Sequence, residues 1–136
     1  MAAYVRIGIG AVSMLLACGF AWRRGSAPVR AAVGLVAVCW TAGILLQFAT
    51  GHTVEPVIAS DIVIALGLLR LAWLKGVSWL WVGVAIEAAV LMIHAVFFHS
   101  GQPPTPLLIF ANNGLMAVGL VAIVMAAIRY PREPAV

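Results

Sequence analysis

The chain has 136 residues, of which 65% are hydrophobic and 9% are charged, with a formal net charge of +4. A soluble domain of this size cannot bury so much apolar surface, so the composition excludes a water-soluble globular protein and predicts that lipid is the main solvent. It also excludes a disordered chain and a nucleic-acid-binding protein, because apolar residues dominate and the basic residues are spread along the sequence.

Five stretches are long and apolar enough to cross the hydrocarbon core as helices, which takes about 20 residues. They cover residues 5–22, 30–50, 57–74, 77–98 and 105–128. The first resembles a signal sequence in length, but its strong charges, Arg23 and Arg24, follow the apolar run instead of preceding it, so we expect a retained helix. The links are short and rich in Gly, Pro and Ser, which predicts antiparallel neighbours and no separate soluble domain. The sequence thus predicts one domain over 1–136, an all-α integral membrane protein built as a bundle of five transmembrane helices.

The basic residues predict the orientation of this bundle. The links after the first and third spans, together with the C-terminal tail, contain Arg23, Arg24, Arg30, Lys75, Arg129 and Arg132. The opposite side contains only Arg6. Because loops rich in Lys and Arg stay in the cytoplasm, we expect the N-terminus outside, the C-terminus in the cytoplasm, and a location in the bacterial inner membrane.

Glu87 lies in the middle of the fourth span, which makes it the most informative residue of the chain. A carboxylate at the centre of a bilayer costs about 2.5 kcal/mol or more, so it usually faces a partner or a water-filled cavity and has a function. Asp61, Arg70 and His94 also lie inside apolar spans. These residues are therefore the first candidates for a site.

The rise of about 1.5 Å per residue predicts the depth of each polar side chain in the membrane. Glu87 and His94 are seven residues apart, close to two turns, so they share one face of the fourth span. Asp61 and Arg70 are nine residues apart, so they point in nearly opposite directions, with Arg70 in the cytoplasmic half. Other polar or aromatic residues predicted in the outer half or at the centre are Gln47, Asn112, Asn113 and Trp40.

The charged residues also have structural interpretations. Glu87 fits a structural ion pair or a protonated carboxyl bonded to a neighbouring helix. His94 fits a neutral imidazole bonded to a backbone carbonyl or to Asp61. Asp61 lies early in its helix, where the helix dipole favours an anion, and Arg70 is near enough to Trp73 to reach the cytoplasmic surface.

The uncharged candidates have structural interpretations of their own. Asn112 and Asn113 fit hydrogen bonding between helices, and Trp40 fits packing in the core. Cys18 and Cys39 both lie inside spans, which predicts buried inert thiols and neither a disulfide nor a thiol redox site.

Cofactor chemistry has little support in the sequence. Membrane haem usually needs two axial ligands, and His94 is the only histidine inside a span, since His52 and His99 lie near the outer surface. Asp61, Glu87 and His94 are acceptable metal-ligand types, but their spacing follows no known motif, so we predict no metal site and leave the cofactor open. The chain also lacks the P-loop, GxSxG and HExxH motifs, so no enzymatic activity is predicted.

The leading functional prediction is proton, ion or small-solute transport along a polar path of Glu87, His94 and Asp61, with Arg70 as counter-charge. The alternative is a non-catalytic accessory subunit of a larger respiratory or photosynthetic membrane complex, whose polar residues meet partner helices or a bound ligand. A weaker alternative is a membrane enzyme or redox protein that uses His94. Because five short helices enclose little volume, we expect a homo-oligomer or a larger complex within the bilayer.

Overall fold

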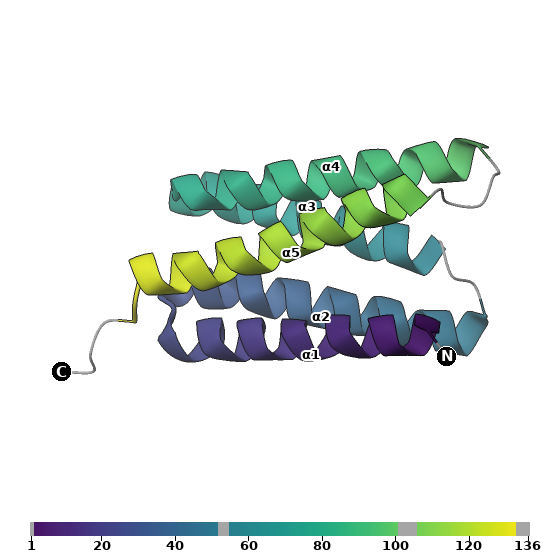
Figure 1. Ribbon diagram of the computed structural model, residues 1–136. Coiled ribbons are helices and arrows are strands. Elements are labelled where there is room, and N and C mark those ends of the chain that lie inside the picture. Colours follow the sequence, from purple (N-terminus) through teal and green to yellow (C-terminus); the bar gives the residue numbers. More distant parts are fainter. Residues whose placement is uncertain (1, 52–54, 101–105, 133–136) are drawn as a thin grey trace.

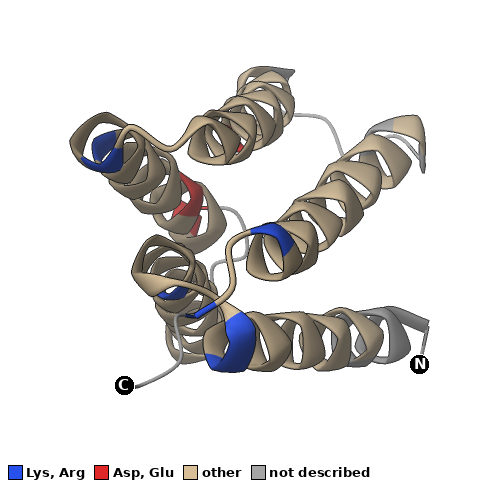
Figure 2. Ribbon diagram, turned by 90° about the vertical axis from the view of Figure 1, so that its left-hand side faces the viewer, with Lys and Arg blue, Asp and Glu red and all other residues tan. Residues whose placement is uncertain are grey.

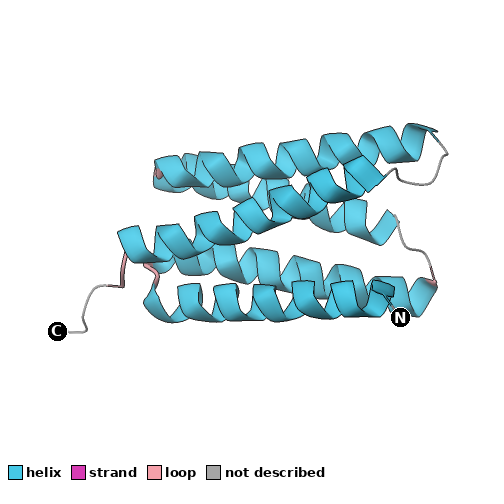
Figure 3. Cartoon of the chain, viewed as in Figure 1, coloured by secondary structure: helices cyan, strands magenta, loops and turns pink. Residues whose placement is uncertain are grey.

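The computed structural model describes residues 2–51, 55–100 and 106–132, with no side chains described at 2–8, 100, 106 and 108. These residues form five helices (Figure 1): α1 (Ala2–Arg24), α2 (Ala27–Thr50), α3 (Glu55–Lys75), α4 (Ser78–Ser100) and α5 (Pro106–Arg129). Each predicted span coincides with one helix, and the ends differ by at most three residues. The prediction of an all-α chain is confirmed (Figure 3). His52 and the Gly- and Pro-containing link at 101–104 lie outside the described residues.

Four of the helices, α2 to α5, are long and apolar enough to cross a membrane. Large apolar side chains also cover the outer surface of the described bundle, among them Phe48, Trp73, Phe98 and Phe110. Exposure on this scale would be unfavourable in water and suits lipid, which supports a membrane location. The span predicted over 5–22 falls on α1, where part of the side chains is outside the description, so a five-span bundle stays a prediction.

The helices form a closed ring. Each helix packs against its neighbours in sequence, α1 also packs against α5, and a smaller contact joins α2 to α5. Figure 2 looks along the bundle and shows this arrangement, with consecutive helices running in opposite directions as the short links predict.

Backbone hydrogen bonds close the ring where α1 ends, α2 begins and α5 ends. The Ser26 N–H donates to the Tyr130 carbonyl at 2.9 Å, and the Arg132 N–H donates to the Arg24 carbonyl at 2.7 Å. Gly25 lies between them, and a Cβ there would collide with the Val29 side chain. The segment after α5 is thereby attached to the turn between α1 and α2.

Most of the basic residues lie at this same end, which we call the basic end: Arg23, Arg24, Arg30, Lys75, Arg129 and Arg132 (Figure 2). The acidic residues of the described helices, Glu55, Asp61 and Glu87, lie at the middle of the bundle or beyond it. The fold therefore brings together charges that are scattered in the sequence.

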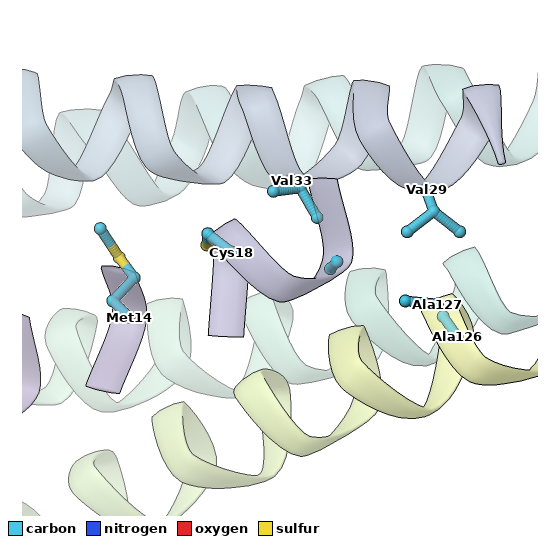
Figure 4. Close-up of a cluster of buried hydrophobic side chains, with 7 residues drawn as sticks. Met14, Cys18, Val29, Val33, Ala126 and Ala127 are labelled. Atoms are coloured by element: carbon cyan, nitrogen blue, oxygen red, sulfur yellow. The ribbon is translucent and has the colours of Figure 1, made fainter. Parts of the chain in front are cut away.

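Two clusters of buried apolar side chains form the core, and both lie largely in the half nearer the basic end. One joins α1, α2 and α5 (Figure 4) and contains Met14, Cys18, Ala21, Val29, Val33, Ala126 and Ala127. The other joins α2, α3 and α4 and contains Ala32, Ile64, Leu68, Ala72 and Leu80. The Cys18 thiol is buried, the Cys39 thiol is half-buried and both are free, as the sequence predicts.

Small residues allow α2 and α3 to approach closely at two levels. A Cβ at Gly43 would lie 2.5 Å from the Ser60 hydroxyl oxygen, and a Cβ at Gly67 would collide with the Leu35 side chain. The Ser60 hydroxyl donates to the Pro56 carbonyl at 2.8 Å, so it is satisfied within its own helix. Glycine at these positions lets the helix backbones pack, as in membrane helix pairs generally.

Candidate functional site

Asp61 and His94 meet across the interface between α3 and α4. The Asp61 Oδ2 and His94 Nδ1 atoms lie 2.8 Å apart, and the two side chains are only 7% and 14% exposed. Asp61 is the one buried charged residue among the described residues. The contact is an ion pair when the imidazole is protonated, and a carboxylate next to an imidazole is the usual arrangement for holding or passing a proton.

Chain geometry explains why these two side chains meet. Asp61 stands six residues after the start of α3, and His94 stands six residues before the end of α4. Because the helices are antiparallel neighbours, both positions lie about 9 Å from the same end of the bundle, the end away from the basic residues. The interpretation of His94 as a partner of Asp61 therefore matches the structure.

Glu87 completes the group on the side of the bundle centre. It lies seven residues before His94 on the same face of α4, about 10 Å further in. The Glu87 carboxylate is half-buried and interacts electrostatically with both Asp61 and His94. We call Asp61, Glu87 and His94 the polar cluster.

The polar cluster contains a buried polar atom that lacks a hydrogen-bond partner. Glu87 Oε2 is buried and has no hydrogen-bond partner among the described residues, whereas Asp61 Oδ2 and His94 Nδ1 face each other at 2.8 Å. Buried polar atoms are normally paired, and each one left unpaired costs free energy. Such atoms are chemically suited to receive a proton, a water molecule or a small polar ligand.

Asn112 lies at a similar depth on α5. It stands six residues after the start of that helix, and its Oδ1 atom is buried without a hydrogen-bond partner among the described residues. Because α5 packs against α4, this amide adds a further buried acceptor to the half of the bundle that contains the Asp61–His94 pair. The next residue, Asn113, is exposed instead.

Two of the other predicted residues have surroundings of their own: Arg70 lies on the outer surface, and Trp40 packs against an apolar cluster. Arg70 is exposed on the outer surface of α3 beside Trp73, on the face opposite the buried Asp61, as the nine-residue spacing predicts. The structure therefore does not bring Arg70 to Glu87. Trp40 packs against the apolar cluster of α1, α2 and α5, and Gln47 is half-buried near the end of α2.

Metal binding finds no support in the geometry. Within the described ranges, no three side chains of His, Cys, Asp or Glu lie close enough together to hold a metal ion. Glu87 and His94 share one face of α4 but are seven residues apart. About two helical turns therefore separate them, which explains why they do not come together around one ion.

Two further buried polar atoms lie near the basic end, and sequence reasoning did not identify them as special. Arg30 Nε and Trp79 Nε1 are buried without hydrogen-bond partners among the described residues. From the sequence alone, Arg30 resembles the other loop charges that set the orientation of the bundle. What distinguishes it is its position three residues after the start of α2, and that position is known only once the start of the helix is known.

Comparison with protein-family models, with curated proteins and with solved structures finds no match for this chain. Its function therefore has to be inferred from the polar cluster and from the bundle that holds it.

Proposed function

We propose that this chain is a small membrane protein that conducts protons through the polar cluster. The observation that carries the proposal is the buried Asp61–His94 contact, with Glu87 in electrostatic interaction with both groups and with its Oε2 atom buried and unpaired among the described residues. Ionisable groups inside membrane spans usually mark ion pathways or proton relays.

The order of the groups along α3 and α4 supports a path with direction. The Asp61–His94 pair lies nearer the end of the bundle away from the basic residues, and Glu87 lies near the middle. A proton that enters at the pair has a second acceptor about 10 Å further in. The rule that basic loops stay inside puts the basic end in the cytoplasm. In this orientation the Asp61–His94 pair forms the extracellular entrance, and the well-packed apolar half lies on the cytoplasmic side.

The chemistry of the three groups suits stepwise transfer. An imidazole can take a proton at one ring nitrogen and release one from the other, and the Asp61 carboxylate lies beside Nδ1 of His94. Glu87 lies beyond the reach of a direct hydrogen bond from His94, because two helical turns separate them. Transfer between them therefore needs an intervening water or a side-chain movement.

The test is proton flux into liposomes that contain the purified chain, with a membrane potential as the driving force. We expect flux in the wild type and a fall to the rate of protein-free liposomes in Glu87→Gln, which keeps the shape of the side chain and removes its titration. Glu55→Gln is the matched control, because Glu55 is an exposed carboxylate in the first turn of α3, outside the polar cluster. Correctly folded wild-type protein that passes no protons would contradict the proposal and favour the accessory-subunit alternative.

A further inference from the structure

A groove on the outside of the bundle lies at the basic end, separate from the polar cluster. It has a volume of about 310 Å³ and is lined by Trp22 of α1 and by Ala27, Arg30, Ala31, Gly34 and Leu35 of α2. Gly34 shapes it, because a Cβ there would lie only 3.2 Å from the Trp22 ring. The indole thus forms one wall and the small residues of α2 form the floor.

Among the described residues, Arg30 is the only charged one that lines this groove. Its Nε atom is buried and has no hydrogen-bond partner among the described residues. A guanidinium offers a planar set of donors that matches the oxygens of a phosphate, so the Arg30 side chain that lines the groove is chemically suited to an anion.

The surroundings of Arg30 strengthen the attraction for an anion. The groove starts at the first turn of α2, where Ala27 lines it and the Ser26 side chain makes no capping hydrogen bond. The N-terminus of a helix favours negative charge. Arg23, Arg24 and Arg129 lie at the same end of the bundle, and none of the acidic residues in the described helices does.

The rest of the groove is apolar and extends from Arg30 along α2 toward Gly34 and Leu35, away from the basic end. An ion such as free phosphate would leave this part unfilled, whereas a lipid would place its phosphate at Arg30 and its acyl chain along the floor. Trp and Arg are also the residues that contact headgroups at membrane interfaces. We propose that this groove binds the phosphate headgroup of an anionic membrane lipid.

The test measures lipid binding to the purified full-length chain in mild detergent by native mass spectrometry. Phosphatidylglycerol is compared with phosphatidylcholine of the same acyl chains. We expect the wild type to prefer phosphatidylglycerol, and Arg30→Gln to lower that preference about tenfold, because a charge-assisted contact is lost. The matched control is Arg129→Gln, which removes one exposed positive charge from the same end outside the groove and should change the preference by less than about twofold.

A second variant covers the case in which Arg30→Gln does not fold. Gly34→Leu keeps every charge and fills the groove beneath Trp22, so it should reduce binding of both lipids. Equal losses in Arg30→Gln and Arg129→Gln would overturn the proposal, since general attraction to the basic end would then explain the preference. Full displacement of the lipid by an equal concentration of inorganic phosphate would also overturn it, because the occupant would then be a free anion.

Discussion

The contact between Asp61 and His94 brings two ionisable side chains together inside an apolar bundle. A buried carboxylate in an apolar bundle is costly unless a partner compensates its charge, and the imidazole 2.8 Å away is the nearest candidate. The pair joins α3 to α4, and in the proposed function it is also the point at which a proton enters the polar cluster.

We expect His94→Ala to destabilise the fold modestly as well as to reduce proton flux. Polar contacts between membrane helices contribute about 0.6 kcal/mol on average and about 1.7 kcal/mol at most, so a loss near 1 kcal/mol is expected. The measurement is the midpoint of thermal unfolding in detergent. His99→Ala is the control, because His99 is an exposed histidine on the same helix and its replacement should leave the midpoint unchanged. Equal effects of the two substitutions would show that Asp61 gains nothing from His94.

The sequence predicts part of the polar cluster and misses part of its environment. The spacing of Glu87 and His94 predicts a shared helix face, and the spacing of Asp61 and Arg70 predicts opposite faces. Spacing within one helix says nothing about how that helix is rotated toward its neighbours, however. For this reason the sequence does not show whether Arg70 faces Glu87 as its counter-charge. In the structure, Arg70 is exposed.

At the scale of helices, the close approach of α2 and α3 depends on residues without bulk. Gly67 faces Leu35, and Gly43 faces Ser60. In a bilayer the tails of the lipids are as apolar as the helices, so tight packing between backbones contributes more to association than burial of apolar surface does. The two glycines are therefore expected to be important for the α2–α3 interface that holds Asp61 in place.

We expect Gly67→Ala to lower the midpoint of thermal unfolding, with a cost of about 1 kcal/mol or more, because the added methyl group must displace the Leu35 side chain. Gly114→Ala is the matched control on α5, since a Cβ at Gly114 meets nothing within 4 Å. It should leave the midpoint unchanged or raise it, because Ala is the better helix former. A fall in both variants to the same extent would argue against a specific α2–α3 contact.

The helices themselves are predictable from the sequence because lipid imposes a strong rule. Every backbone polar group in a spanning segment must be satisfied internally, so an apolar run of about 20 residues becomes a helix whatever its detailed pattern. It is less predictable which helices pack together when they are not consecutive in the sequence. The contact between α1 and α5 depends on long-range closure, which short links do not determine. The same holds for the two hydrogen bonds between the segment after α5 and the α1–α2 turn, in which the Tyr130 carbonyl accepts and the Arg132 N–H donates.

At the scale of the whole molecule, the two ends of the bundle differ in character. The half near the basic end contains most of the buried apolar side chains, whereas the other half contains the Asp61–His94 pair and Asn112. A path that crosses the bundle would therefore begin in the polar half and meet its main barrier in the packed half. Leu68 and Leu80 are buried in this packed half and belong to that barrier.

Orientation in the membrane can be tested with single cysteines. In a chain whose native Cys18 and Cys39 are replaced by Ala, we expect Thr50→Cys to react with an impermeant thiol reagent added outside intact cells. Lys75→Cys should react only after the membrane is opened, because it lies at the basic end. Labelling in the reverse order would show that the basic end faces outward and would invert the proposed direction of the path.

The most direct test of the central claim is modification of Glu87 by a hydrophobic carbodiimide, which reacts with protonated carboxyl groups in apolar surroundings. Modification and proton flux are measured in the same liposomes, and the modified residue is identified by mass spectrometry. We predict that Glu87 is modified and that flux falls in proportion to the modified fraction. Complete modification of Glu87 with unchanged flux would contradict the claim that protons move through the polar cluster.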